Sequence, residues 1–572
     1  MRPLPIDKKP PSVIATMLIT IMFSALIGSF VAIAASMFVT GIEWFTGKHE
    51  LIGELSIKIW NKTLNFNGFV IIMIAGLCLI LIRKLFPISR YHGPADSIHI
   101  AHNVNKNEHV RDGFLSTCAA FISLSGGAPV GQYGPLVHLG TTLSLLVKKT
   151  IPKITWQNDV FVGCGVAAAI SAGFHAPIAG IVFAHEAVIR HLSFRAVVPI
   201  AISSVISFAL SKHFFSGSTL LSFAPVDFEM YAIAPLILFS GIFFGFVAIF
   251  MMSSLFYSNK LAQKIDLPAP KLIFFGSVAL GILSVFWPGL LGSKNEQITR
   301  LFLDGDTAYT LILMAALQIL GLSIALTCGI YGGVFSPALF VGALSGGVMG
   351  GIFSSLGLTS HPQLFVVAGM SAVAACVVGA PISMFLIILE ITKLYDVGVL
   401  SMLATVTAVL VSSAFHSHSF FDEQLRLRGV DLSKGRANIH LSTLKMGEFC
   451  HQKFVGLAPG TTVSKAILTL TENGYSEGYV INESSGLLGK VSLIDLLQCD
   501  SNQKLDKALT DDFLSLEIST NVIDAMDMLQ SFVGESVPVI DAANNTIAGV
   551  VSEADIFKIF ADTQDKISRQ EH

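Results

Sequence analysis

The sequence predicts an α-helical polytopic membrane domain built from two similar halves, followed by a smaller soluble α/β module. Only 13% of the 572 residues are charged and 52% are hydrophobic, and a soluble protein carries about twice that charged share. Apolar stretches recur over the first 415 residues, and several are long enough to cross a bilayer. The motifs that interrupt these stretches occur twice at a nearly constant spacing. These observations exclude a soluble multidomain enzyme.

The charge distribution separates the two parts of the chain. Residues 1–440 contain 27 basic and 20 acidic side chains, whereas residues 441–572 contain 9 basic and 19 acidic ones. The membrane part is therefore net positive and the soluble part net negative. Neither part carries a basic stripe, so we expect no nucleic-acid partner. The seven cysteines are scattered, and no two form a C-x-x-C pair, so we expect no zinc site or disulfide framework.

The N-terminus reads as a cytoplasmic segment followed by a retained membrane helix. Residues 1–11 are polar and basic, and the apolar run that follows extends from residue 12 to about residue 40. That run is about twice as long as the core of a signal peptide. Basic residues precede the first span and follow the last one, at Arg426, Arg428, Lys434 and Arg436. This pattern predicts that both termini are cytoplasmic and that the number of crossings is even.

The later apolar stretches are interrupted by glycine and proline. They lie near residues 68–86, 114–148, 160–189, 196–215, 231–256, 272–292, 308–330, 333–357, 363–392 and 397–415. A helix broken at membrane depth frees backbone groups, which is tolerated only inside protein or beside a water-filled cavity. Glycine also serves close helix packing. The breaks therefore indicate either a transport site or tight packing.

A repeat of the breaks favours the transport site. Residues 167–186 match residues 371–390, with an Ala-Pro-Ile in each segment and a glutamate nine residues after each proline. Gly131-Gln-Tyr-Gly-Pro135 likewise matches Gly333-Val-Phe-Ser-Pro337. Two halves with matching broken helices are typical of transporters that bind their substrate at the repeat interface. We place the membrane domain at residues 12–429, with halves at about 12–215 and 231–429.

The soluble part is also a duplication. After a linker at residues 430–444, residues 445–500 and 505–563 each contain a helix, two apolar strands and a closing turn. The turns are Gly489-Lys-Val-Ser-Leu-Ile-Asp495 and Gly549-Val-Val-Ser-Glu-Ala-Asp555. Two such repeats predict one compact α/β module, and residues 564–572 form a polar tail.

The paired helix breaks are suited to binding an anion. A helix that begins inside the membrane points unsatisfied N–H groups and a positive dipole end at whatever lies before it. Such a site binds an anion without a lysine, and conduction requires binding that is weak enough for release. The residues alone therefore predict an anion pathway lined by the N–H groups of residues 131–135 and 333–337.

These motifs resemble those of the CLC chloride channels and transporters. Residues 131–135 resemble the family's G-[KR]-E-G-P motif, and residues 333–337 its G-x-F-x-P motif. Phe174-His-Ala-Pro-Ile-Ala-Gly180 with Phe183 and Glu186 resembles F-N-A-P-L-A-G-x-x-F-x-x-E. The segment from Ser419 to Gly429 is similar to the end of the family's membrane domain, and residues 445–563 resemble a CBS-domain pair.

The resemblance implies an inverted-repeat fold, a homodimer in a lipid bilayer with one pore per subunit, and small inorganic anions, chloride by default, as cargo. It implies no enzymatic activity and no required cofactor. The cell (inner) membrane is the expected location. The central site would use the N–H groups of Val334 and Phe335, and the outer site those of Gln132, Tyr133 and Gly134. The complete predicted pathway is Gly131, Gln132, Tyr133, Gly134, Pro135, Gly333, Val334, Phe335, Ser336, Pro337, His92, Gly93 and Phe421.

Four departures from the family pattern carry the functional prediction. Tyr133 replaces the glutamate that competes with anions and carries the coupled proton, which makes it the gate candidate. Ala187 replaces a second, internal proton-handling glutamate. Phe421 replaces a tyrosine and loses an anion-donating hydroxyl. His92 occupies a position that influences the preference for chloride or nitrate, so bicarbonate, nitrate and other anions stay open.

The sequence therefore favours a passive anion channel or uniporter, and two alternatives remain. An exchanger could use substitute proton groups, for which His185 and Glu186 are candidates, although Glu186 also suits a structural role near a helix end. A membrane-anchored CBS sensor without transport is the third reading. In the CBS pair, Asp495 and Asp555 are candidates for binding the ribose of an adenine nucleotide, with a purely dimer-stabilising role as the alternative.

Overall fold

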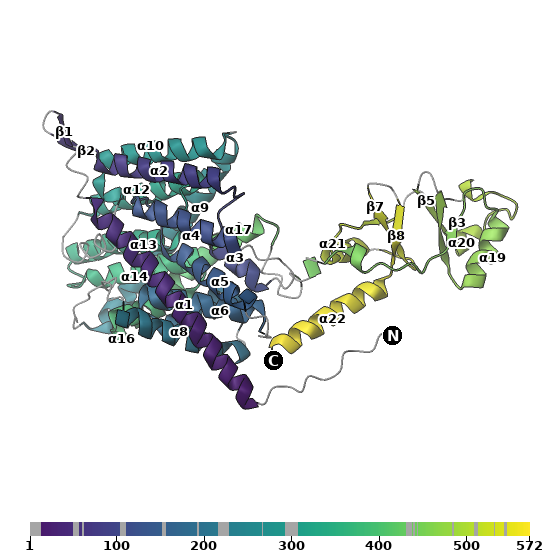
Figure 1. The fold of residues 1–572 in the computed structure, drawn as a ribbon, viewed down its shortest axis with the longest axis horizontal. Helices are drawn as coiled ribbons and strands as arrows, with labels where there is room; N and C mark the ends of the chain where they lie inside the picture. The colour runs from purple at the N-terminus through teal and green to yellow at the C-terminus, as the bar shows by residue number, and fades with distance from the viewer. Residues whose placement is uncertain are drawn as a thin grey trace. The chain divides into compact units, whose positions relative to one another are not determined.

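The chain folds into two compact units, Met1–Val430 and Asp431–His572, in a computed structural model (Figure 1). The structure describes residues 13–49, 56–59, 62–102, 110–150, 156–191, 194–214, 228–265, 267–291, 307–430, 438, 441–442, 444–482, 486–507, 509, 513–530, 532–542 and 546–571. The predicted N-terminal segment 1–11 and most of the predicted linker 430–444 lie outside these residues.

The first unit is a helical bundle with one small hairpin. Eight of its described helices are long and apolar enough to span a membrane. The predicted interruptions fall between helices, since α4 ends at Ser125 before the first break and α5 begins at Tyr133 within it. The elements are α1 (Val13–Gly47), β1 (Ser56–Ile59), β2 (Lys62–Asn65), α2 (Asn67–Leu85), α3 (Pro94–His102), α4 (Val110–Ser125), α5 (Tyr133–Thr150), α6 (Asn158–Phe174), α7 (Pro177–Phe183), the π-helical turn η2 (Ala184–Ile189), α8 (Phe194–Phe214), α9 (Met230–Gln263), α10 (Ala269–Phe286), the 3-10 turn η3 (Pro288–Leu290), α12 (Ala308–Thr327), α13 (Phe335–Ser355), α14 (Gln363–Val378), α15 (Pro381–Thr392), α16 (Tyr395–Phe415) and α17 (Phe420–Arg426).

The second unit contains two similar three-stranded sheets. Their strand orders are β3-β4-β5 and β6-β7-β8, and in each the first pair is parallel and the second antiparallel. The prediction of a helix and two strands per repeat omitted the short strands β3 and β6. The elements are η5 (Met446–Glu448), β3 (Gly456–Leu457), α19 (Val463–Asn473), β4 (Glu477–Asn482), β5 (Gly486–Ser492), α20 (Leu493–Leu496), η6 (Leu505–Lys507), β6 (Leu516–Glu517), α21 (Val522–Leu529), β7 (Val537–Asp541), β8 (Thr546–Val551) and α22 (Glu553–Glu571).

Glycine pairs bring equivalent helices of the two halves into contact. On α5 and α6, a Cβ atom added to Gly140 would overlap the carbonyl group of Gly165. On α13 and α14, a Cβ added to Gly342 would overlap the carbonyl oxygen of Gly369 in the same way. Small residues let the backbones of membrane helices approach closely. Glycine therefore serves packing here, whereas the glycines of the breaks lie outside these helix interiors.

The short helices α7 and α15 begin in matching geometry. α6 ends at His175, which has φ 54°, and α14 ends at Gly379, which has φ 78°. Each left-handed residue reverses the chain, and the next proline, Pro177 or Pro381, occupies the first turn of the new helix. Proline suits that turn because its missing N–H has no intrahelical partner there. The Ala-Pro repeat thus marks two symmetry-related helix starts.

The contact between α13 and α14 predicts a position-specific cost for adding one methyl group. Gly342→Ala should destabilise the protein by about 1–3 kcal/mol, since overpacking forces the backbones apart. Gly351→Ala on the same helix is the matched control, because a Cβ there meets nothing within 4 Å. Thermal unfolding of the purified proteins in detergent measures the difference. Equal melting temperatures for the two variants would contradict this account of the packing.

Candidate anion pathway

The two predicted breaks lie against each other. The N–H of Gly131 donates to the carbonyl of Gly333 at 2.6 Å, and the N–H of Gly333 donates to the carbonyl of Gly131 at 2.7 Å. α5 begins two residues after the first glycine and α13 two residues after the second. Segments 202 positions apart in sequence therefore form one pair of helix N-termini, as the repeat suggests.

The two breaks cross at Gly131 and Gly333, and this crossing brings the two backbones so close that glycine is favoured there. A Cβ on Gly131 would lie 2.8 Å from Pro337 Cδ, and one on Gly134 would lie 3.0 Å from the Cα of Gly333. The N–H of Gln132 donates to Ser336 Oγ at 3.3 Å. The crossing is thus fixed by backbone contacts and by one side-chain hydroxyl.

The first turns of α5 and α13 leave several backbone donors available. Among the described residues, the N–H groups of Tyr133, Gly134, Val334 and Phe335 donate no hydrogen bond. Such first-turn donors carry the positive end of the helix dipole. Helix N-termini are recognised anion-binding positions. The crossing therefore presents two sets of N–H groups that can bind an anion, and neither motif contains a lysine or an arginine.

An aromatic cluster covers these donors. The ring of Tyr133 stacks on Phe174 with centroids 3.7 Å apart and an interplanar angle of 21°. Phe335 lies 5.6 Å from Tyr133 and 5.3 Å from Phe174, and Phe183 lies 6.1 Å from Phe335. Tyr133 is only 2% exposed. A buried, stacked phenol therefore occupies the predicted gate position.

Phe421 and Ala187 belong to a neighbouring region around α17. Phe421 is buried, and its closest ring partner is Phe420, at 5.8 Å. Asp422, the next residue, forms an ion pair with Arg190 of the chain after η2. The Nε of Arg190 also donates to the carbonyl of Ala187 at 3.3 Å. An arginine–carboxylate pair thus contacts the backbone of Ala187, the residue at which the family resemblance expects a proton-handling glutamate.

His92 and Gly93 lie in a loop that reaches the crossing. Pro94, which begins α3, would be 3.5 Å from a Cβ on Gly134. The hydroxyl of Tyr331, two residues before Gly333, donates to the carbonyl of His92. Sequence reasoning missed this tyrosine, because its partner lies 239 positions away and no local motif marks it.

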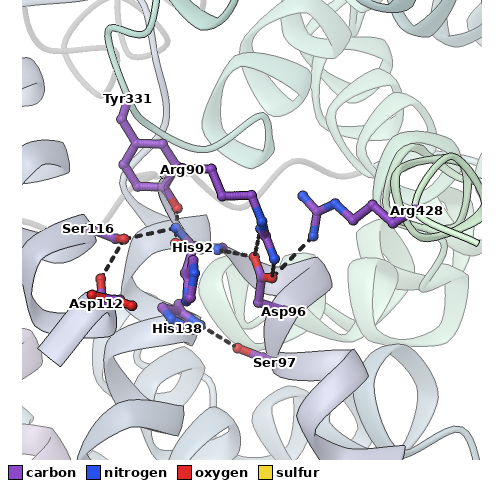
Figure 2. Close-up of polar contacts among 10 residues, drawn as sticks. Arg90, His92, Asp96, Ser97, Asp112, Ser116, His138, Tyr331 and Arg428 are labelled. Atoms are coloured by element: carbon purple, nitrogen blue, oxygen red, sulfur yellow. Dashed lines mark hydrogen bonds and ion pairs between the residues drawn. The ribbon is translucent and has the colours of Figure 1, made fainter. Parts of the chain in front are cut away.

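A buried carboxylate joins this loop to the turn that follows α17 (Figure 2). Asp96 accepts hydrogen bonds from Arg90 at 2.5 and 3.0 Å and from Arg428 at 3.1 Å. It also accepts the N–H of Gly93 at 2.9 Å. Asp96 lies outside the candidate membrane-spanning helices. Burial raises the pKa of its carboxyl, but the two guanidinium groups outweigh burial and hold the pKa well below its usual value.

Two carboxylates cross between the short helices α7 and α15. Glu186 accepts the N–H groups of Ile382 and Ser383 at 2.9 and 2.8 Å, and the hydroxyl of Ser383 at 2.6 Å. Glu390 accepts the N–H groups of Ile178 and Ala179 at 3.0 and 2.7 Å. Each glutamate therefore caps the first turn of the other half's short helix.

The histidine next to this cap has a different environment. His185 Nδ1 lies 2.9 Å from the carbonyl of Ile181. Its Nε2 is buried and has no hydrogen-bond partner among the described residues. The two residues predicted as a proton relay therefore differ. Glu186 accepts three hydrogen bonds, whereas His185 has one ring nitrogen with no partner among the described residues.

Each nucleotide candidate lies in the first turn of a helix and accepts the hydroxyl of the serine three residues before it. Asp495 accepts the hydroxyl of Ser492 at 2.9 Å. Asp555 accepts the N–H and hydroxyl of Ser552 at 3.0 and 2.6 Å, and it pairs with His451 at 3.2 Å. Burial raises the pKa of the Asp555 carboxyl, but these hydrogen bonds and the His451 charge outweigh burial and hold the pKa below its usual value. A ribose at Asp555 would thus compete with His451.

The fold and the crossing define a class of protein. A helical bundle with two related halves, whose broken helices present N–H groups at one point, has the architecture of a membrane transport protein. The profile of the family described as voltage-gated chloride channel matches residues 71–413, and the CBS-domain profile matches residues 446–502 and 506–562. The chain belongs to the CLC family, whose members are integral membrane proteins that transport chloride or similar anions, and it carries a CBS pair.

Individual relatives are distant in sequence. The ClcB-like chloride channel protein of Ralstonia nicotianae is 26% identical over 360 residues, covering 62% of this chain and 83% of the relative. Chloride channel protein CLC-f of Arabidopsis thaliana is 22% identical over 478 residues, covering 79% of this chain and 58% of the relative.

Solved structures share the fold. A eukaryotic CLC transporter matches with a TM-score of 0.63 and 16% identity, covering 95% of this chain and 98% of that one. A slow cyanobacterial Cl⁻/H⁺ antiporter matches with a TM-score of 0.63 and 19% identity, covering 72% and 97%. These likenesses establish the CLC fold.

The crossed glutamate caps predict matched losses of stability. Glu186→Ala and Glu390→Ala should each lower the free energy of unfolding by about 1–3 kcal/mol, because the N–H groups in the first turns of α15 and α7 lose their acceptor. Glu229→Ala, at an exposed position, is the control and should leave the melting temperature unchanged. Thermal unfolding in detergent checks both results. A Glu186→Ala protein as stable as the control would refute the capping role.

Proposed function

We propose that the protein is a passive, proton-uncoupled anion channel or uniporter with chloride as its default cargo. One observation carries the proposal. The buried and stacked Tyr133 occupies the gate position beside the available N–H donors of α5 and α13. A tyrosine hydroxyl has a reference pKa of about 10 and stays neutral at physiological pH. It can block a pore or donate to an anion, but it cannot alternate between a carboxylate and a neutral acid.

The residues expected on the inner side of the pathway support the same proposal. Ala187 carries no ionisable group, and the adjacent ion pair joins Arg190 to Asp422. An arginine keeps its proton throughout the physiological range. Proton transfer from the inner solution to Tyr133 thus lacks an acid at both positions that the family resemblance assigns to it.

The gate in this proposal is the aromatic stack. The phenol ring of Tyr133 must leave Phe174 before an anion can occupy the outer N–H groups of α5. Aromatic pairs contribute roughly 0.5–1.5 kcal/mol beyond burial, and the stack adds that amount to the cost of moving the buried ring. Phe421 removes one hydroxyl donor from the inner route, and such a change could also suit nitrate or bicarbonate.

The assembly and the membrane follow from the family. We propose a homodimer in the lipid bilayer of the cell (inner) membrane, with both termini cytoplasmic. An adenine nucleotide on the CBS pair, contacting Asp495 or Asp555, is a further proposal. Its competitor is a purely structural module held by its own contacts, such as the hydrogen bonds that the N–H of Glu535 donates to the Glu477 carboxylate and the N–H of Ser476 donates to the Glu535 carboxylate.

A proton-coupled exchanger is the second candidate, and the unsatisfied Nε2 of His185 favours it. Glu186 is a weaker relay because its oxygens already accept three hydrogen bonds. Glu43 of α1 is a further acid within electrostatic range of Tyr133. A CBS sensor without transport is disfavoured, since the paired breaks would be destabilising without a pathway to line.

Substitution of the gate residue tests the proposal. Tyr133→Ala should raise chloride efflux from liposomes about two- to tenfold, since the aromatic stack that closes the pathway is lost. Tyr133→Phe keeps the stack and should behave like the wild type. Tyr309→Ala, a tyrosine that is 76% exposed on α12, is the control. Unchanged efflux and selectivity in Tyr133→Ala would remove this side chain from the mechanism.

A further inference from the structure

One side of α2 carries a stripe of exposed apolar side chains. The other side packs against α10, where Gly76 faces Ser277 (Figure 1). The stripe consists of Ile74, Leu77, Leu81 and Leu85, each of them more than half exposed. Spacings of three and four residues place these side chains on one helix face. The helix rises about 16 Å over the stripe, which is about half of the roughly 30 Å hydrocarbon thickness of a bilayer. The stripe therefore matches the depth of one lipid leaflet.

Three unpaired cations lie at the end of this stripe. Arg83 and Lys84 belong to the last turn of α2, and Arg111 belongs to the first turn of α4. The guanidinium of Arg111 reaches the end of α2, since it lies 6.0 Å from the centre of the Phe86 ring. Within the described parts of the chain, none of the three cations forms an ion pair with a carboxylate. Their positive charge is therefore not balanced by the protein.

The helix dipoles account for only part of this cluster. Cations are favoured at the C-terminus of a helix, which suits Arg83 and Lys84 in the last turn of α2. Arg111 lies at the opposite, positive end of α4, where the dipole favours an anion instead. A cation at that end gains nothing from its own helix. An external anion between the two helix ends would compensate all three charges.

Both guanidinium groups are held in place by aromatic rings. Arg111 lies over Phe86, and Arg83 lies 5.9 Å from the centre of the Tyr91 ring. The Nη2 of Arg83 also donates to the carbonyl of Ser89 at 3.4 Å. A guanidinium that is already positioned loses less conformational freedom when it binds, and its planar donors match the oxygens of a phosphate. The cluster therefore favours a phosphate group over a simple counterion.

We propose that Arg83, Lys84 and Arg111 bind the headgroup phosphate of an anionic phospholipid, whose acyl chain lies along the apolar stripe of α2. A lipid uses both features, whereas free phosphate would use the cations and leave the adjoining stripe unexplained. Basic residues beside a membrane helix attract anionic lipids in this way. The inference requires only that the chain is embedded in a membrane, as members of its family are. It does not depend on which anion the pathway carries, or on whether protons are coupled to it.

Lipid binding to the full-length protein in detergent tests the proposal, with native mass spectrometry as the measurement. The wild type should bind dioleoyl phosphatidylglycerol more tightly than dioleoyl phosphatidylcholine, whose headgroup has no net charge. The triple variant Arg83→Gln/Lys84→Gln/Arg111→Gln should lose at least about tenfold in affinity for phosphatidylglycerol, since each basic residue contributes on the order of fivefold. Arg111→Gln alone, at an exposed position, should lose about fivefold and keeps the test available if the triple variant does not fold.

A second cationic helix end supplies the matched control. Lys260, Lys264 and Lys271 lie around the end of α9 and the start of α10, are exposed, and form no ion pair among the described residues. They are lysines without a positioned guanidinium, so the variant with all three changed to glutamine should keep the wild-type affinity.

Three outcomes would overturn the inference. The first is equal affinity of the wild type for the two lipids. The second is a loss in the lysine control as large as that in the triple variant, which would assign the binding to general surface charge. The third is displacement of phosphatidylglycerol by inorganic phosphate at constant ionic strength, which would indicate a site for the free anion. None of these outcomes bears on the proposed anion transport, which chloride efflux from liposomes measures separately.

Discussion

Two hydrogen bonds between Gly131 and Gly333 join the halves of the membrane unit at the point where its chemistry is expected. They align the first turns of α5 and α13, so that donors from distant parts of the sequence lie side by side. Both positions favour glycine, because a Cβ on Gly131 would lie 2.9 Å from the carbonyl oxygen of Gly333 and a Cβ on Gly333 would lie 3.0 Å from the backbone nitrogen of Gly134. The crossed caps of Glu186 and Glu390 repeat this arrangement one layer away, again with each half completing a helix start of the other. The repeat is therefore a structural requirement as well as a trace of duplication.

Under the proposed function, the predicted departures from the family pattern change the electrostatics of one pathway in a consistent direction. Tyr133 would remove a carboxylate from the outer donors, and Ala187 would leave the inner position without an acid. Each of these changes removes negative charge from the proposed route of the anion. Such a pathway would need no proton to displace a competing carboxylate, and its closure would depend on the stack of Tyr133 on Phe174.

The sequence predicted the features that depend on local patterns. The breaks, the two halves and the CBS repeat could be found because glycine, proline and glutamate recur at fixed spacing, and Gly131 and Gly333 meet as the repeat suggests. The two short parallel strands β3 and β6 and the hairpin β1-β2 were missed, since two- to four-residue strands give little periodicity. Contacts between distant positions, such as Asp96 with Arg428, leave no pattern in one sequence. The assignments of the pathway residues remain predictions, as do the roles of His185 and the CBS aspartates.

The most direct test of the central claim is a simultaneous recording of chloride efflux and proton uptake by the wild-type protein in liposomes. The account predicts that chloride leaves when an ionophore releases the membrane potential, while the external pH stays constant. Proton uptake against its gradient, in a fixed ratio to chloride, would contradict it. In that case Tyr133 and Ala187 would not define the coupling, and the proton route would have to use His185, Glu186 or Glu43.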